Sequence, residues 1–472
     1  MTMSNGHPRG YQAVKGLAKQ LGWRIPELLT LHPKNDPFFA GSPAQQARAE
    51  WFSELWQQLQ LQHGVHLRRI HYRLLSLDGL QRHDGKPYEN TDTCWDYLTE
   101  ASKAARHLGL VAPDDFDDHR NPPPRRLTDL ARPDEEPGWR IDDVLRWRLP
   151  RISTDLAGEL HFVLPKVWPV GYGYSEGAQP YVLECWVEKS TVDDVLLPVC
   201  EELGITLVTS VGFQSISSVI RLLKRVAASG KPARIWYISD FDPAGDSMPV
   251  SVVRQIEYYR DDYAPRARIK LTPLALRRDQ VVSYRLPRTP IKESDLRRYG
   301  FEERYGEGAV ELDALEALFP GELATMLREA ASPYVDSSLR ARRDDAWWNA
   351  QDRLNSALLE AAAEEQGALD AITTEARTIL DQYQERLSAL ATELDEALAP
   401  LQERLKTVRL AVQERLDALE VELPDCPEPS VTVPGEWDWL FDADRDYLDQ
   451  LAVYKAHKGG IVPNGTTHDQ EG

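Results

Sequence analysis

The sequence contains little cysteine and no long apolar segment. Its four cysteines, Cys94, Cys185, Cys200 and Cys426, are far apart and form no C-x-x-C pair, which argues against a zinc knuckle and against a disulfide scaffold. No stretch approaches the roughly 20 apolar residues that span a bilayer, and residues 1–10 lack the apolar core of a secretory signal. We therefore expect a cytoplasmic protein with reduced thiols and no membrane partner.

A nucleotide-binding fingerprint is also missing. The chain has no G-x-x-x-x-G-K-[ST] loop, and the segment from Gly171 to Gly173 is too short to bind a nucleotide. Any ATP dependence would therefore come from a separate ATPase partner. The chain does have enough residues, 472 with 42% hydrophobic, for about three folded domains.

Charge is distributed unevenly along the chain. The formal net charge is −20, but residues 1–300 sum to +2 and residues 301–450 to −22. Residues 251–300 are the most basic segment, at +6, so the first two thirds of the chain can face a polyanion. The acidic part could dimerise the chain, or it could cover the basic segment as a DNA mimic. In the second case, a chain ending at Ser332 would bind DNA more tightly at low salt.

The first third of the sequence predicts three helices. Ser42 and Pro43 begin a helix that ends near Gly64, a second covers residues 66–77, and a third begins at Asn90 or Thr91 and stops at Gly109. Three helices with short connections suit a helix-turn-helix or winged-helix module. The alternative is a helical bundle that binds no nucleic acid.

The middle of the sequence alternates strands and helices. The pattern predicts strands over residues 160–164, 181–187, 205–209 and 234–239, with helices over 191–203 and 215–228. Such alternation is typical of parallel strands covered by helices, a Rossmann-like arrangement in which ligands bind at the carboxyl ends of the strands.

Residues 337–422 predict long helices. Their apolar side chains recur about every 3.6 residues, whereas a sustained left-handed coiled coil needs 3.5. Pro400 removes a backbone donor, which favours a kink or an antiparallel helix hairpin over one rod. We therefore expect a mixed α/β multidomain protein with five segments. They are a helical extension (1–64), a winged-helix domain (65–150), a parallel-sheet domain with a basic loop (155–335), a helical hairpin or coiled coil (336–423), and a Pro-rich linker with an acidic tail (424–472).

Three acids follow two of the predicted parallel strands. Glu188 follows one strand, and Asp240 and Asp242 follow another, so all three are expected at one sheet edge. Close carboxylates repel one another by about 4 kcal/mol per pair at a surface-like dielectric, and a hard divalent cation relieves this repulsion. All-oxygen ligation favours Mg²⁺ or Mn²⁺. The alternative is that these are solvated strand-end and helix-cap acids. Asp246 is either an outer ligand or a helix N-terminal acid.

At these residues the sequence resembles a known family. Glu188 and the segment from Asp240 to Gly245, which reads D-x-D-P-x-G, resemble the Toprim domain of topoisomerases and related nucleases. This form is similar to that of the topoisomerase VI A subunit and its meiotic double-strand-break relatives. The resemblance covers about residues 60–320. It implies a Toprim domain preceded by a winged-helix domain, a homodimer, and a tyrosine nucleophile that works with the metal of the partner subunit.

The same resemblance assigns the tyrosine. Residues 68–75 resemble the family motif with Arg68 at its arginine and Tyr72 at its nucleophile, although Arg69 and His71 depart from the pattern. Arg68 precedes Tyr72 by one helical turn and could bind the scissile phosphate. A free tyrosine has a pKa of about 10 and needs such help. The alternative for Tyr72 is a buried helix tyrosine packed beside Leu74.

Basic residues are the expected DNA contacts. Residues 277–298 hold seven cations near the predicted metal site, and phosphate contacts of this kind make affinity fall steeply with salt. The alternative is a solvated basic surface. The complete set of expected DNA-binding residues is Arg69, Arg73, Lys103, Arg277, Arg278, Arg285, Arg288, Lys292, Arg297 and Arg298.

Two further residues and one segment accompany the motif. Glu184 shares a strand face with Glu188 and would at best support the site. Lys189 would either neutralise the acids or be solvated. The segment from Glu311 to Leu315 weakly resembles a downstream element of the family and predicts a core helix.

Three functional hypotheses follow from these residues. The first is metal-dependent DNA strand cleavage by a topoisomerase VI A-like protein through a tyrosyl-DNA intermediate. The second is a hydrolytic Toprim nuclease, active against foreign DNA, in which a metal-bound water attacks and Tyr72 is idle. The third is a DNA-binding scaffold subunit whose Toprim fold is structural.

Overall fold

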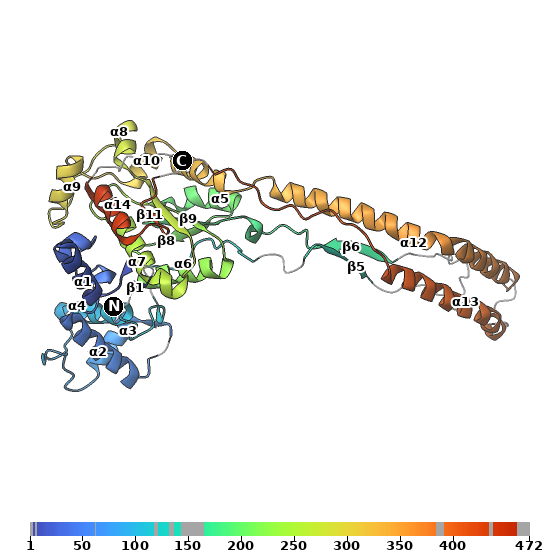
Figure 1. The fold of residues 1–472 in the computed structure, drawn as a ribbon, viewed down its shortest axis with the longest axis horizontal. Coiled ribbons are helices and arrows are strands. Elements are labelled where there is room, and N and C mark those ends of the chain that lie inside the picture. Colours follow the sequence, from blue (N-terminus) through green and yellow to red (C-terminus); the bar gives the residue numbers. More distant parts are fainter. Residues whose placement is uncertain are drawn as a thin grey trace. The chain divides into compact units, whose positions relative to one another are not determined.

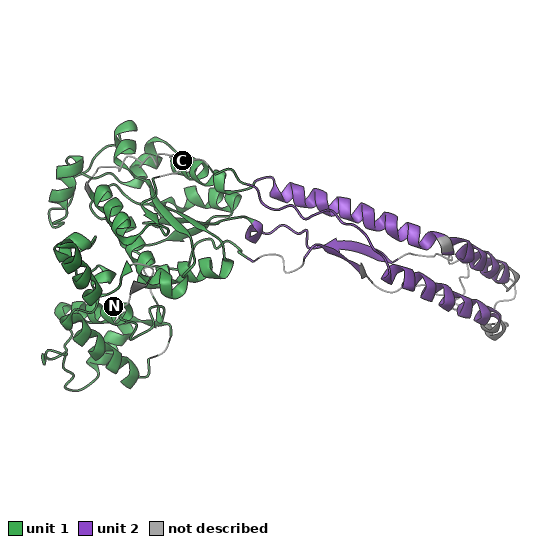
Figure 2. Cartoon of the chain, viewed as in Figure 1, with its two compact units in different colours: residues 1–130, 179–336, 431–472 green, residues 131–178, 337–430 purple. Residues whose placement is uncertain are grey.

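The computed structural model describes residues 3–4, 7–61, 63–117, 121–131, 136–142, 165–383, 391–433 and 438–459. The chain forms two compact units, each assembled from segments that are distant in sequence (Figure 2). Unit 1 comprises residues 1–130, 179–336 and 431–472, and unit 2 comprises residues 131–178 and 337–430. No helix in the described ranges has an apolar stretch long enough to cross a bilayer.

A five-stranded sheet forms the centre of unit 1 (Figure 1). Its strand order is β11-β10-β9-β7-β8, with the first four strands along the chain parallel and β11 antiparallel at one edge. The mixed α/β class and the mostly parallel sheet predicted from the sequence are therefore confirmed, while the strand predicted at residues 160–164 lies outside the described residues. The strands are β7 (Val182–Val187), β8 (Thr206–Thr209), β9 (Ala233–Ile238), β10 (Ile269–Ala275) and β11 (Phe441–Asp442).

Helices cover both faces of this sheet, and successive strand residues point into different cores. Trp186 and Tyr237 pack with α6 and α7 on one face, whereas Cys185 and Trp236 pack with α5, α10 and α11 on the other. The helices around the sheet are α5 (Asp193–Leu203), α6 (Ile216–Ser229), α7 (Met248–Tyr263), α8 (Arg278–Ser283), α9 (Arg298–Tyr305), α10 (Leu312–Leu318) and α11 (Glu322–Ala331).

The N-terminal part of unit 1 is helical, and three of its helices, α2, α3 and α4, begin close to where the sequence predicts, whereas α1 was not predicted. Ser42 and Gln45 form a capping box at the start of α2, and the Thr91 hydroxyl accepts a hydrogen bond from the Cys94 amide at the start of α4. A short parallel pair, β3 (Val65–His66) and β4 (Phe116–Asp117), joins this region. The helices are α1 (Tyr11–Leu21), α2 (Pro43–Gln58), α3 (Leu67–Leu75) and α4 (Asp92–His107).

The C-terminal segment of unit 1 is part of its core, which the sequence did not predict. Strand β11 extends the sheet, and α14 (Tyr447–Gly459) places Tyr447, Leu451 and Tyr454 in the buried cluster around α7. The fully buried Arg254 donates to Asp36 (3.1 Å), to Glu257 (2.8 Å) and to the Tyr447 hydroxyl (3.2 Å).

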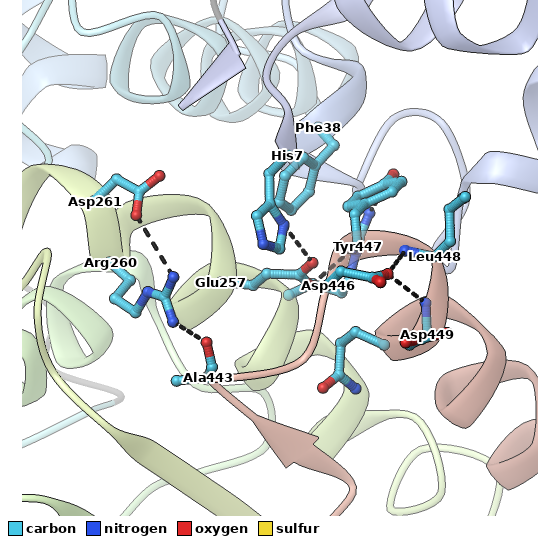
Figure 3. A network of polar contacts seen from close by, with 12 residues as sticks. His7, Phe38, Glu257, Arg260, Asp261, Ala443, Asp446, Tyr447, Leu448 and Asp449 are labelled. Carbon is cyan, nitrogen blue, oxygen red and sulfur yellow. Dashed lines mark hydrogen bonds and ion pairs between the residues drawn. The ribbon is translucent and has the colours of Figure 1, made fainter. Parts of the chain in front are cut away.

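Further polar contacts link α7 to the two terminal segments (Figure 3). His7 Nδ1 lies 3.2 Å from Glu257 Oε1, and Arg260 donates to the Ala443 carbonyl. The first contact joins the N-terminal segment to α7, and the second joins the C-terminal segment to α7. Polar contacts therefore attach segments from both ends of the described chain to the same helix of unit 1.

Unit 2 is built from an antiparallel strand pair and a helix hairpin. Strands β5 (Gly138–Asp142) and β6 (Lys166–Val170) pair antiparallel. Helices α12 (Leu339–Tyr383) and α13 (Ala391–Asp417) also run antiparallel. Two ion pairs show this direction, since Arg404 contacts Glu375 (2.5 Å) and the later Arg415 contacts the earlier Glu365 (3.0 Å).

The sequence left open a kink at Pro400 or an antiparallel hairpin. The structure has two antiparallel helices, α12 and α13, and α13 continues through Pro400. Pro400 is exposed, whereas its neighbours Leu398 and Leu401 pack against α12 in a buried cluster. This packing offsets the backbone hydrogen bond that proline removes.

Candidate acidic site at the sheet edge

Two of the predicted site residues follow adjacent parallel strands. Strands β7 and β9 pair with Val187 opposite Ile238, and the Glu188 amide donates to the Ile238 carbonyl at 3.0 Å. The register therefore puts Glu188 and Asp240 at the same carboxyl edge. The Asp240 amide donates to Glu188 Oε2 at 3.0 Å, which joins the two positions directly.

A tight turn brings Asp242 to the same place. Asp242 Oδ1 accepts a hydrogen bond from the Gly245 amide at 2.6 Å, and the Ser239 hydroxyl donates to the Gly245 carbonyl at 3.1 Å. A Cβ atom added to Gly245 would lie 2.0 Å from the Asp240 carbonyl oxygen, so only glycine fits this close approach. The glycine of the D-x-D-P-x-G sequence is thus required by the backbone path of this turn.

Two of these carboxylates have raised pKa values. Burial, followed by the charges of Asp240 and Asp242, raises the pKa of Glu188 to about 7. Burial and the charge of Asp240 also raise the pKa of Asp242. Glu188, Asp240 and Asp242 are all only partly exposed.

Lys189 is the cation that compensates this charge. Its ammonium lies 2.9 Å from Asp240 Oδ1, 2.6 Å from Asp313 Oδ2 and 3.2 Å from Glu311 Oε2. Although burial disfavours the charged amine, the hydrogen bonds to Asp313 and Asp240 raise the pKa of Lys189 above its usual value. Of the two roles considered for Lys189, the structure shows the neutralising one.

Glu311 and Asp313 belong to this site, and the sequence did not assign them to it. Phe241 and Val310 exchange two backbone hydrogen bonds of 2.8 and 2.9 Å, which hold the start of α10 beside the D-x-D turn. The Leu312 amide then donates to Asp240 Oδ1 at 2.7 Å. The core-helix prediction holds for Leu312 and Leu315. The weak resemblance of this segment to a downstream family element was the only available signal for the acids.

The residue types at this edge are oxygen donors of the kind that hard divalent cations prefer. Carboxylate oxygens are the ligands that Mg²⁺ and Mn²⁺ favour, and burial together with neighbouring acids raises the pKa of Glu188. Within the described ranges, however, no three His, Cys, Asp or Glu side chains are arranged as ligands of one metal ion. Asp240 instead forms an ion pair with Lys189 and accepts a hydrogen bond from the Leu312 amide, and Asp242 accepts one from the Gly245 amide.

Asp246 and Glu184 are engaged elsewhere. Asp246 accepts hydrogen bonds from Arg304 and from the Tyr305 hydroxyl, both at 3.2 Å. Glu184 is fully buried in a two-pronged ion pair with Arg225 (2.9 and 3.0 Å) and also accepts from the Trp186 indole at 2.7 Å. Glu184 therefore anchors α6 to β7, and Asp246 anchors α9 to the start of α7.

Tyr72 lies on an exposed face of α3. Its side chain is 61% exposed, so the alternative of a buried tyrosine packed beside Leu74 is wrong. Arg68, Arg69 and Arg73 on the same helix are also exposed. His71 is buried instead, with Nδ1 2.7 Å from the Tyr88 hydroxyl.

The expected DNA-binding cations differ in their surroundings. Lys103 is only partly exposed and donates to Asn35 at 3.0 Å, and Arg288 donates to the carbonyls of residues 306–308. Arg277, Arg297 and Arg298 pair with the nearby acids Asp279, Asp295 and Glu302 respectively. Arg278, Arg285 and Lys292 are exposed, and so are Arg277 and Arg297 despite their ion pairs. The predicted basic loop also contains the helix α8 and the start of α9.

No model of a known protein family matches the chain, and no curated protein is significantly similar to it.

Proposed function

We propose that this protein cleaves DNA strands with the help of a divalent cation, in the manner of the topoisomerase VI A subunit that its sequence resembles. The observation that carries the proposal is the convergence of Glu188, Asp240 and Asp242 at the ends of two adjacent parallel strands. Their carboxylates would hold Mg²⁺ or Mn²⁺, with the cation replacing Lys189 as a partner of Asp240. The bound cation would offset the charge that develops on the scissile phosphate.

In the proposed reaction, Tyr72 is the nucleophile. Its phenol oxygen forms a bond to phosphorus while the bond from phosphorus to the sugar oxygen breaks, and that oxygen takes up a proton. Exposure of Tyr72 and the neighbouring Arg68 supports this role, because the guanidinium can hold a phosphate beside the phenol. Within one chain, α3 packs in the N-terminal helical cluster and the acids follow β7 and β9. In the family that the sequence resembles, the tyrosine works with the metal of the partner subunit, so this route uses a homodimer.

A hydrolytic nuclease is the second candidate function. It is favoured by the same separation of α3 from the acids, because attack by water needs no second copy of the chain. Detergent denaturation distinguishes the two routes. The tyrosine route predicts a covalent protein-DNA adduct that is abolished by Tyr72→Phe, whereas cleavage by Tyr72→Phe without any adduct supports hydrolysis.

The proposal is tested with plasmid DNA and Mg²⁺. Glu188→Gln and Asp240→Asn are expected to lose at least about 100-fold in cleavage rate, since each removes a ligand charge. Asp194→Asn is the matched control, because Asp194 is an exposed acid at the start of α5. Unchanged cleavage in the two site variants would overturn the role of these acids in the reaction, and no cleavage by the wild type would leave the scaffold hypothesis.

A further inference from the structure

We propose that the loop after β8, residues 210–214, binds a nucleobase of the cleaved strand, with Phe213 as the stacking surface. This inference rests on the function proposed above and adds the position at which a base of the bound DNA strand contacts the protein. The loop is beside the acidic site. The Ser210 amide donates to the Val187 carbonyl at 3.0 Å, and the Gly212 amide donates to the Glu188 carbonyl at 3.3 Å.

The loop is held firmly, yet it presents apolar side chains to solvent. The Ser210 hydroxyl bonds the carbonyls of Val187 (3.2 Å) and Gly212 (3.0 Å), and Gly212 adopts a positive φ of 83°. Nevertheless Val211 is 70% exposed and Phe213 is 43% exposed. Neighbouring exposed apolar residues on a fixed backbone are typical of a binding surface.

Gln214 gives a second, independent indication of a ligand. Its side chain is 5% exposed, and neither its amide nitrogen nor its amide oxygen has a hydrogen-bond partner among the described residues. A buried amide without hydrogen-bond partners destabilises the fold. Nucleobase edges carry both donors and acceptors, so a base bound at this loop could satisfy the amide.

The order of the β-strands places apolar, acidic and basic side chains one after another along the carboxyl edge of the sheet. This arrangement suits a bound strand of nucleic acid. From β8 to β10 the carboxyl edge carries the apolar loop, then Glu188, then Asp240 and Asp242, then Arg277 and Arg278. A strand crossing this edge would place its scissile phosphate at the acids and its neighbouring phosphate over the cations. The base on the other side would then lie against Phe213. Aromatic stacking of this kind tolerates any base sequence.

The test measures binding of a fluorescent single-stranded DNA oligonucleotide to the full chain, with Ca²⁺ in place of Mg²⁺ to prevent cleavage. Phe213→Ala is expected to weaken binding about 5- to 100-fold, and Phe213→Trp is expected to restore it. The dependence of affinity on salt should be the same for Phe213→Ala as for the wild type, because no phosphate contact is lost. Arg278→Ala should instead lower the salt slope by about 1.

A modified oligonucleotide locates the contact. With 2-aminopurine scanned along the strand, fluorescence should be quenched at one position in the wild type and not in Phe213→Ala. An abasic nucleotide at that position should make the two proteins bind equally. Equal binding of the unmodified strand by wild type and Phe213→Ala, or no binding by the wild type, overturns the stacking site. Plasmid cleavage that requires Asp240 would then still support the proposed function, so the two ideas fail separately.

Discussion

At the scale of single residues, Glu188 has the clearest electrostatic consequence. Its pKa of about 7 in the folded chain stands above the usual 4.5 of a glutamate because of burial and two neighbouring acids. Between these values the folded chain binds a proton that the unfolded chain releases. The contribution of Glu188 to stability is therefore fully present below about pH 4.5 and is lost as the pH rises through 7.

This shift predicts that Glu188→Gln stabilises the metal-free protein at high pH. Because glutamine stays neutral, the variant should exceed the wild type by about 3 kcal/mol in free energy of unfolding at pH 8, and the two should converge near pH 4. Denaturant unfolding in a chelator between pH 4 and pH 8.5 measures the difference, with Asp194→Asn as the control. A gap that is the same at every pH would show that packing, not ionisation of Glu188, causes it.

The sequence predicted the acids of the site better than their partners. Glu188, Asp240 and Asp242 could be predicted because each follows a strand, and parallel strands bring their carboxyl ends to one edge. The contacts of Lys189 could not be predicted, because Glu311 and Asp313 reach it only through the pairing of Phe241 with Val310. Sequence spacing alone carries no information about that pairing.

At the scale of secondary-structure elements, the boundaries of the helices that the sequence predicted, and those of β7, β8 and β9, followed from local signals. Capping residues and glycines marked the helix ends, and largely apolar runs marked these three strands. Strands β10 and β11 were not predicted, and β11 has only two residues and follows a Pro-rich segment. Its place in the sheet depends on tertiary contacts of α14 rather than on its own sequence.

The attachment of α14 yields a prediction at this scale. The Tyr447 hydroxyl accepts from Arg254 and donates to the Leu28 carbonyl at 2.7 Å, in a buried position. Tyr447→Phe removes the hydroxyl that bonds Arg254 and the Leu28 carbonyl, so the free energy of unfolding should fall by about 1–3 kcal/mol. Tyr299→Phe is the control, since Tyr299 is exposed. Equal thermal midpoints for both variants would mean that the hydroxyl adds nothing to the attachment of α14.

At the scale of the whole molecule, the division of the chain into two units decides which deletion can test the role of the acidic region. A chain ending at Ser332 would lose β11 and α14, whose residues Phe441, Tyr447 and Tyr454 are buried in the core of unit 1. Such a truncation would therefore unfold part of unit 1. The acidic hairpin of unit 2 can be removed more selectively, because Arg342 donates to the Glu428 carbonyl at 2.9 Å and the two ends of the hairpin lie close together.

Replacing residues 345–425 with a short Gly/Ser linker should strengthen DNA binding at low salt if the acidic hairpin repels or competes with DNA. The gain should shrink as salt rises, because screening weakens interactions between separated charges. Titration with a labelled duplex at 50 and 300 mM salt measures this, and thermal unfolding checks that unit 1 is intact. Equal affinities at both salt concentrations would rule out autoinhibition by the hairpin.

The central claim is that Glu188, Asp240 and Asp242 hold one divalent cation, and Mn²⁺ bound in crystals tests it most directly. The account predicts one anomalous peak within about 2.2 Å of oxygens from these carboxylates, with the Lys189 ammonium displaced from Asp240. Asp240→Asn crystals should lose the peak. A Mn²⁺ peak remote from these three side chains, or none while Lys189 still contacts Asp240, would contradict the account.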